Sequence, residues 1–193
     1  FSDRIIANAI RYELSRNGQV YMVHNRVLTI NSFADHLRKL VPEARVSVVH
    51  GQMPERLIER EMKLFLERKT DVLVCTTIVE SGIDLPNVNT LIIDQAHRFG
   101  LADLHQLRGR VGRFTRQAYA YLLIPPAEPI SEESAKRLKT IERYSELGAG
   151  FQIALQDLEI RGAGNILGPE QSGHIAAVGY DLFCKILEHA VRQ

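Results

Sequence analysis

The chain has 193 residues, of which 45% are hydrophobic and 24% charged, enough for one α/β domain with a modest appendage. It has no apolar run near the roughly 18 residues of a membrane span and no opening signal-peptide pattern, so we expect a cytoplasmic protein. The formal net charge of +1 excludes a uniformly basic surface, so any phosphate-binding surface must be a local patch.

Strands and helices are predicted to alternate along the first two thirds of the chain. Short apolar runs rich in β-branched residues predict strands at 20–24, 46–49, 72–75, 90–94 and 118–124. The segments between them have helical apolar periodicity, around 33–40, 54–66 and 104–108. Because the strands are apolar throughout, the expected fold class is α/β, with a parallel sheet covered by helices on both faces.

Two finer expectations follow from this alternation. In the helix that Pro54 opens, four apolar side chains form the predicted buried stripe: Leu57, Met62, Phe65 and Leu66. Parallel sheets bind ligands at the carboxyl ends of their strands, and the polar motifs of this chain are expected there.

The pattern changes after Pro125 and Pro126. Ser131 is predicted to cap a helix, and residues 131–158 to form a helical hairpin. Glycines crowd residues 162–173, and a last helix is expected near 180–191. The predicted domains are residues 1–126, 127–175 and 176–193.

An arginine cluster is the strongest chemical signal. Between Leu104 and Gln117 there are four arginines and no acidic residue, and we expect these like charges to require an anionic partner. Gly109 and Gly112 would let the backbone approach a bulky anion closely, which favours phosphate contact over a solvated basic face.

The run from Gln106 to Arg113, Gln-x-x-Gly-Arg-x-Gly-Arg, resembles motif VI of superfamily 2 helicases and translocases. Residues 76–84 look like motif V, residues 23–26 resemble motif IV, and residues 50–53 resemble the element just after it. The resemblance implies a RecA-like domain, the second of two in such motors.

The resemblance also implies roles for individual residues. Arg113 would be the arginine finger that reaches a nucleotide on the partner domain, with Arg110 beside it. The remaining nucleotide-side residues would be Gln106, Gly82 and Asp84. The expected DNA contacts are Thr76, Asn25, His50 and Gly51. Without the family, Asp84 reads equally well as a turn residue before Pro86.

The sequence has no Gly-x-x-x-x-Gly-Lys-Ser/Thr loop, so it offers no cradle for β- and γ-phosphates. Asp94–His97 (DQAH) imitates a metal-and-base box, but Gln95 cannot act as a base. We therefore expect ATP and Mg²⁺ to be held by the first RecA-like domain, no metal here, and an inactive isolated chain. Cys75 and Cys184 are interpreted as reduced, buried thiols.

The hairpin and residues 157–173 resemble the TRG element shared by RecG helicases and bacterial transcription-repair coupling factors. In that element a hairpin and loop convert domain closure into movement along duplex DNA, and Arg161 and Gln171 match its functional positions. The alternative for this glycine-rich segment is a flexible connector.

Residues 146–151 and 178–191 look more like the coupling factors than RecG. That resemblance implies a parent protein that pushes on duplex DNA with ATP, displaces stalled RNA polymerase and recruits excision-repair proteins through regions outside this chain. Two alternatives remain open: a fragment of a fork-regressing helicase of the RecG type, and a nucleic-acid-binding module without ATPase function.

Overall fold

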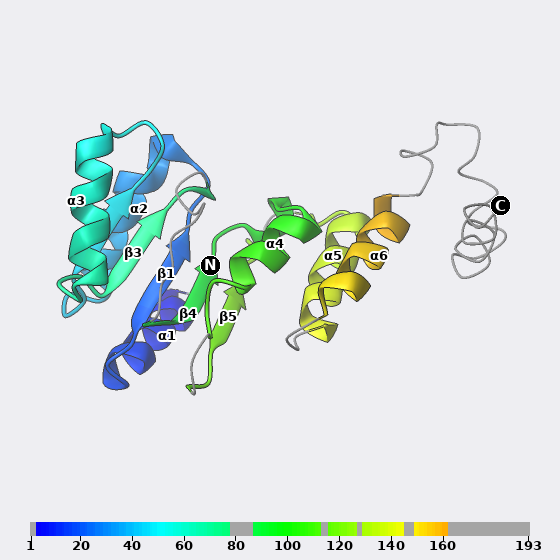
Figure 1. The fold of residues 1–193 in the computed structure, drawn as a ribbon, viewed down its shortest axis with the longest axis horizontal. Coiled ribbons are helices and arrows are strands. Elements are labelled where there is room, and N and C mark those ends of the chain that lie inside the picture. The colour runs from blue at the N-terminus through cyan, green and yellow to red at the C-terminus, as the bar shows by residue number, and fades with distance from the viewer. Residues whose placement is uncertain (1–2, 78–86, 113–115, 127–128, 145–148, 162–193) are drawn as a thin grey trace, which may run out of the picture. The chain divides into compact units, whose positions relative to one another are not determined.

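The computed structural model describes residues 3–77, 87–112, 116–126, 129–144 and 149–161 (Figure 1). The chain divides into two compact units, Phe1–Phe99 with Asp103–Pro129 and Gly100–Ala102 with Ile130–Gln193. The domain boundaries expected after residues 126 and 175 stay predictions, and the second lies outside the described residues. The helix expected near 180–191 lies outside them as well.

All five predicted strands are present, and described helices separate them except between the third and fourth, where residues 78–86 lie outside the described part of the chain. In chain order these elements are α1 (Asp3–Ser15), β1 (Gln19–Val23), α2 (Val27–Leu40), β2 (Val46–Val49), α3 (Glu55–Leu66), β3 (Val72–Cys75), β4 (Val88–Ile93), the 3₁₀ turn η2 (Ala96–Arg98), α4 (Leu101–Arg108) and β5 (Tyr119–Leu122).

The five strands form one sheet in the order β2-β3-β1-β4-β5, and every neighbouring pair is parallel. Strands β1, β3 and β4 are buried along their whole length, as expected for strands covered on both faces. The predicted fold class, a parallel RecA-like sheet, is therefore confirmed.

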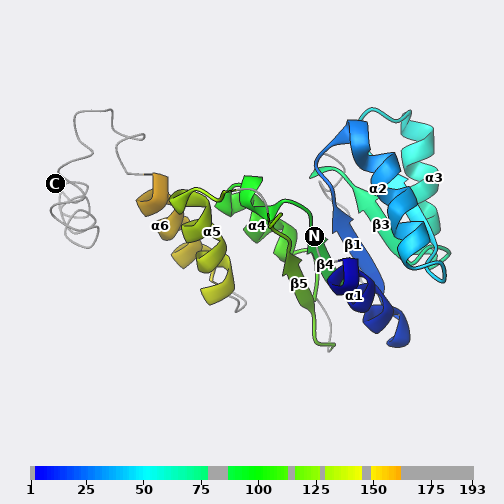
Figure 2. The same ribbon diagram turned by 180° about the vertical axis from the view of Figure 1, so that it is seen from behind.

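Helices cover both faces of this sheet. Side chains of α1 and α2 pack with Val20, Met22 and Val74 in one buried cluster, so these two helices share a face. Helix α3 lies on the opposite side of β2 and β3 (Figures 1 and 2). Side chains that alternate along each strand therefore reach two separate helical layers.

The predicted stripe of α3 is only partly right. Met62 and Phe65 are buried, whereas Leu57 is 42% exposed and Leu66 is 46% exposed. Because successive helical residues are about 100° apart, both leucines lie beside the narrow stripe that faces the sheet.

Helix α1 was not among the predicted elements. Its buried face follows a helical spacing through Ile6, Ile10 and Glu13, and the last of these is a carboxylate with no exposed surface. Because its stripe of buried residues ends in a charged residue, this segment has too weak an apolar periodicity to predict a helix.

Glu13 leaves no room for a side chain at residue 18. A Cβ atom at Gly18 would lie 1.6 Å from Glu13 Oε1, so an alanine there must displace the carboxylate. Displacement would break the bond that Thr90 Oγ1 donates to Glu13 Oε2 at 2.6 Å. We expect Gly18→Ala to lower the free energy of unfolding by about 3 kcal/mol, the scale for disrupting a buried, paired charge.

Chemical denaturation of this chain measures that loss. Gly51→Ala is the control, because residue 51 is exposed and, among the described residues, no atom would crowd a Cβ there. A denaturation midpoint for Gly18→Ala equal to that of the control would contradict the packing described here.

The second unit contains α5 (Glu132–Arg143) and α6 (Gly150–Arg161), which pack against each other (Figure 1). Ser131 Oγ accepts a hydrogen bond from the Ser134 amide at 3.1 Å, so the predicted helix cap is confirmed. The predicted hairpin of residues 131–158 is thus present as two helices, the second of which runs to Arg161.

Candidate functional site

Three neighbouring strands end at the same edge of the sheet, and the predicted DNA-contact residues follow them directly. Val23 and Val49 both pair with Cys75, so the carboxyl ends of β1, β2 and β3 are level. Asn25, His50 and Thr76 come within two residues of those ends. The structure therefore brings these residues, with Gly51, to one carboxyl edge.

This carboxyl edge is polar and partly ordered by its own contacts. The Thr76 amide donates to the Val49 carbonyl at 3.3 Å, and Thr77 Oγ1 donates to Asn25 Oδ1 at 3.2 Å. Thr76 is 1% exposed, and among the described residues its hydroxyl has no hydrogen-bond partner. His50 Nδ1 is also buried and without one there. Buried polar atoms of this kind need a partner, which a bound phosphate or water can supply.

A buried histidine–aspartate pair lies next to the carboxyl edge. His24 Nδ1 is 2.6 Å from Asp94 Oδ2, and His24 Nε2 is 2.8 Å from Thr29 Oγ1. The imidazole also stacks on Phe33, with ring centroids 4.5 Å apart. These contacts join the ends of β1 and β4 to the start of α2.

The pair gives Asp94 a structural partner, although the segment Asp94–His97 resembles a metal-and-base box in sequence. Asp94 is 4% exposed and engaged with His24, and Gln95 has a left-handed backbone (φ 52°) that turns the chain after β4. Among the described residues no group of three or more His, Cys, Asp or Glu side chains is placed to hold a metal. The sequence alone did not reveal the His24 partner, since the two residues are 70 positions apart.

The arginine cluster lies at the other end of the sheet, which corrects the expectation that all polar motifs lie at the carboxyl edge. Helix α4 ends in a turn in which the Arg110 amide donates to the Leu107 carbonyl at 3.0 Å. The Gly112 amide then donates to the Val88 carbonyl at 3.4 Å, at the amino end of β4. In a parallel crossover the helix must return to the amino end before the next strand can begin. The turn Arg110–Gly112 is therefore placed by the topology itself.

Gly112 has a conformation that few other residues tolerate. Its φ is +80°, and a Cβ atom there would lie 2.7 Å from Ala118 Cβ. Glycine at this position thus allows the turn to pack closely on the chain that leads into β5.

Two arginines of the cluster, Arg108 and Arg116, are engaged within the fold. Burial lowers the pKa of the Arg108 guanidinium. Burial, and secondly the charge of Arg108, lower the pKa of His105, whose Nδ1 lies 3.3 Å from Arg108 Nη2. Arg116 Nη1 donates to the Arg16 carbonyl at 2.7 Å, so this guanidinium has a partner within the fold, although a neutral one.

The other predicted site residues are described in part or not at all. Gln106 is exposed on α4, and Arg161 is the last residue of α6. Four predicted positions lie outside the described residues: Gly82, Asp84, Arg113 and Gln171. Their roles stay predictions, as do those of the residues that the structure places.

No helix among the described residues is long and apolar enough to span a membrane.

Three kinds of similarity place the chain among known proteins. It is 57% identical to the transcription-repair-coupling factor of Mycobacterium bovis over 189 residues, covering 98% of this chain and 15% of that protein. It is 51% identical to the factor of Escherichia coli K12 over 191 residues, covering 99% of this chain and 17% of that protein. The chain thus spans only a small part of the length of these relatives.

Solved structures agree with the sheet topology. RecG bound to a three-way DNA junction matches with a TM-score of 0.69 and 36% identity, over 85% of this chain and 22% of that chain. The helicase domain of Pyrococcus furiosus Hef matches with a TM-score of 0.52 and 22% identity, over 65% of this chain and 26% of that chain, which shows a shared fold alone. The model of the helicase conserved C-terminal domain matches residues 3–115, which include the sheet strands β1 to β4 and three of the four arginines of the cluster. The chain therefore belongs to the helicase conserved C-terminal domain family.

Proposed function

We propose that this chain is the second motor domain of an ATP-driven translocase on double-stranded DNA, of the transcription-repair-coupling type. The observation that carries the proposal is the level carboxyl edge of β1, β2 and β3, where the buried Thr76 hydroxyl and His50 Nδ1 have no partner among the described residues. A hydroxyl and an imidazole are suited to donate hydrogen bonds to DNA phosphate oxygens.

The nucleotide side of the proposal rests on the arginine turn. Arg110 lies in a turn anchored at the amino end of β4, away from the proposed DNA edge. Arg113 follows this turn in the sequence, and Gln106 precedes it on an exposed part of α4. In this proposal both arginines face a nucleotide whose phosphates, with Mg²⁺, are held by the first motor domain, and Gly82 and Asp84 contribute on the ribose side.

Bound ATP would supply the phosphoryl group whose transfer drives the motor. This chain would supply positive charge as negative charge develops on the transferred group, because a guanidinium fork matches phosphate oxygens. Since this chain has no lysine-and-backbone cradle of its own, we expect the chain alone to hydrolyse no ATP.

The high identity to coupling factors supports that type over RecG, because 57% identity over 98% of the chain exceeds 36% over 85%. We propose accordingly that the full-length protein displaces stalled RNA polymerase and works with excision-repair proteins, both through regions outside this chain. Fork regression without polymerase displacement by the full-length protein would favour the RecG type.

The two ends of strand β3 offer a matched pair of threonines to test the DNA edge. Thr76 follows the strand and Thr70 precedes it, and both hydroxyls are buried without a partner among the described residues. We expect Thr76→Val to lower duplex affinity about tenfold in the full-length protein with a nonhydrolysable ATP analogue, because a hydrogen bond to a charged phosphate is lost. Thr70→Val should leave that affinity unchanged.

Fluorescence anisotropy with a labelled duplex at several salt concentrations measures these affinities. The salt dependence should stay the same in both variants, because neither removes a positive charge. Equal affinities for Thr76→Val and Thr70→Val would count against the proposed DNA edge. Tight, steeply salt-dependent binding by the isolated chain would instead favour a nucleic-acid-binding module that needs no ATP.

A further inference from the structure

A buried charged network joins α1 to the amino end of β4, close to the arginine turn. The carboxylate of Glu13, which has no exposed surface, accepts from Thr90 Oγ1 at 2.6 Å, from Asn89 Nδ2 at 3.3 Å and from Arg16 Nη2 at 2.8 Å. A carboxylate is stable in such a place only when its oxygens are paired in this way. Glu13 and Arg16 therefore act as one unit fixed to β4.

Arg16 extends this network to the segment that leads into β5. The same Nη2 atom donates to the Gln117 carbonyl at 2.9 Å, and Arg116 Nη1 donates in return to the Arg16 carbonyl at 2.7 Å. The Arg16 guanidinium also lies 5.0 Å from the ring centroid of Tyr12 and 5.4 Å from that of Tyr119. A planar, delocalised cation suits a position between two rings and two oxygen acceptors.

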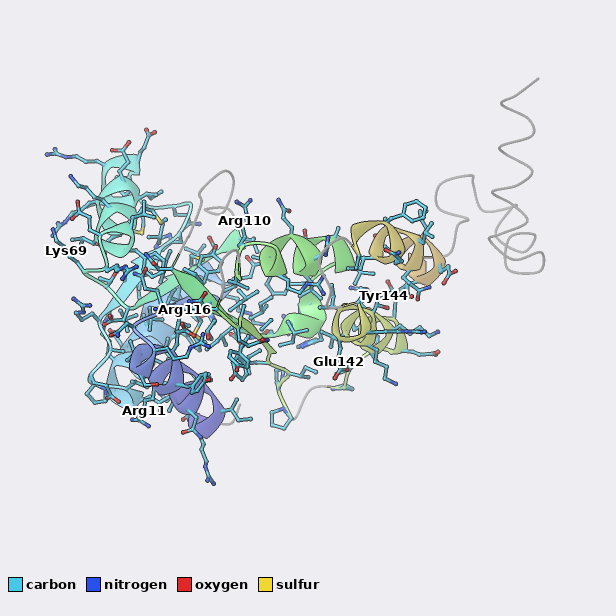
Figure 3. All side chains as sticks on the ribbon, turned by 60° about the horizontal axis from the view of Figure 1, so that its bottom comes forward. Arg11, Lys69, Arg110, Arg116, Glu142 and Tyr144 are labelled. Carbon is cyan, nitrogen blue, oxygen red and sulfur yellow. The ribbon has the colours of Figure 1, made fainter. Side chains whose placement is uncertain are left out.

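The chain on both sides of Arg113 is thus held to one block of structure. On one side, the Gly112 amide is bonded to the Val88 carbonyl. On the other, Arg116 and Gln117 are bonded to Arg16. Figure 3 labels Arg110 and Arg116, which precede and follow this position in the chain. In the sequence only residues 113–115 separate the two anchors.

We propose that Glu13 and Arg16 are positioning residues for Arg113, acting through the anchor at Arg116 and Gln117. This inference rests on the proposed function, in which Arg113 is the arginine finger. A finger stabilises the transferred phosphoryl group only at close range, and a misplacement of about 1 Å can cost on the order of a hundredfold in rate. Loosening the anchor should therefore weaken the transition state more than the bound ground state.

Arg16→Lys is the variant that isolates this role, because it keeps the positive charge but loses the planar fork. Its matched control on the same helix is Arg11→Lys. Arg11 also makes two hydrogen bonds, to Glu43 Oε1 at 2.7 Å and to the Leu40 carbonyl at 3.1 Å, but away from β4. Glu13→Gln, which keeps the size of the side chain, is the second test variant.

Two affinities of the full-length protein bound to duplex DNA are compared: that for ADP with aluminium fluoride, which mimics the transferred phosphoryl group, and that for a nonhydrolysable ATP analogue. We expect Arg16→Lys and Glu13→Gln to weaken the affinity for ADP with aluminium fluoride at least about tenfold. The affinity for the ATP analogue should stay unchanged. Arg11→Lys should change neither. A loss of stability alone would weaken both affinities by the same factor, so it cannot imitate a loss confined to the aluminium fluoride complex.

Equal weakening of both affinities, no weakening, or the same effect in Arg11→Lys would each overturn the inference. Arg113→Ala measured in parallel tests the finger role of Arg113 separately from the positioning role of Arg16. If Arg113→Ala leaves the aluminium fluoride complex intact, the finger assignment itself fails. If it weakens that complex, Arg16→Lys combined with Arg113→Ala should lose no more affinity than Arg113→Ala alone, and additive losses would show that Arg16 acts elsewhere.

Discussion

Replacing Arg113 with alanine in the full-length protein should lower DNA-stimulated ATP hydrolysis by about 10³- to 10⁵-fold, the contribution of an arginine finger in phosphoryl-transfer enzymes. The physical reason is that charge developing on the transferred group would lose its nearest positive partner. Phosphate release at saturating ATP and duplex DNA measures the effect. Affinity for a nonhydrolysable ATP analogue should change far less, because the finger acts mainly in the transition state.

Arg60→Ala is the control for this experiment, because Arg60 is an exposed arginine of α3 and has no place in the proposed site. It should hydrolyse ATP at the wild-type rate. If Arg113→Ala kept more than about a tenth of the wild-type rate, the loss would fall far below the range of an arginine finger, and the assignment would be wrong.

Arg161→Ala should separate hydrolysis from movement. Arg161 ends α6, the second helix of the hairpin, and begins the segment that resembles the TRG loop. Because Arg161 is not among the residues proposed for the nucleotide site, ATP hydrolysis should persist, whereas removal of a DNA-bound roadblock should be lost. Hydrolysis and roadblock release are measured on the same duplex, so that one sample gives both rates.

Arg143→Ala provides the matched control, since Arg143 ends the other hairpin helix and its guanidinium lies 5.6 Å from the ring centroid of Tyr144. That variant should both hydrolyse ATP and clear the roadblock. Roadblock removal by Arg161→Ala at the wild-type rate would exclude a coupling role for this residue.

The centre of the sheet could be predicted from the sequence because strands β1, β3 and β4 are buried along their whole length. Such strands are continuous apolar runs, and runs of this kind are hard to mistake when helical segments separate them. The placement of Asn25, His50 and Thr76 at one edge of the sheet could also be predicted, because each follows a strand closely and parallel strands end together.

Features that depend on pairing across long sequence separations could not be predicted. Glu13 appears as a charged interruption until Thr90 and Arg16 are seen to satisfy it. Asp94 resembles part of a catalytic box until His24 is found beside it. In both cases the structural role of the carboxylate can be predicted only when its partner is known. The fold, and not the local sequence, brings that partner close.

The position of the arginine turn could have been predicted from the sequence, but the prediction put it at the carboxyl edge of the sheet. A helix that follows a parallel strand must run back along the sheet, so its last residues lie at the amino edge. For α4 this rule predicts that the arginine turn lies at the amino edge, whereas Thr76 and His50 lie at the carboxyl edge. The separation gives the proposed motor two distinct surfaces, one for the nucleotide and one for DNA.

Displacement of a third strand from duplex DNA tests the central claim most directly. A triplex-forming oligonucleotide occupies the major groove and is released when a motor passes along the duplex, even if the duplex strands stay paired. With full-length protein and ATP, we expect release of the third strand without separation of the duplex, and no release with a nonhydrolysable analogue. ATP hydrolysis with the third strand still bound would contradict the assignment of this chain to a duplex translocase.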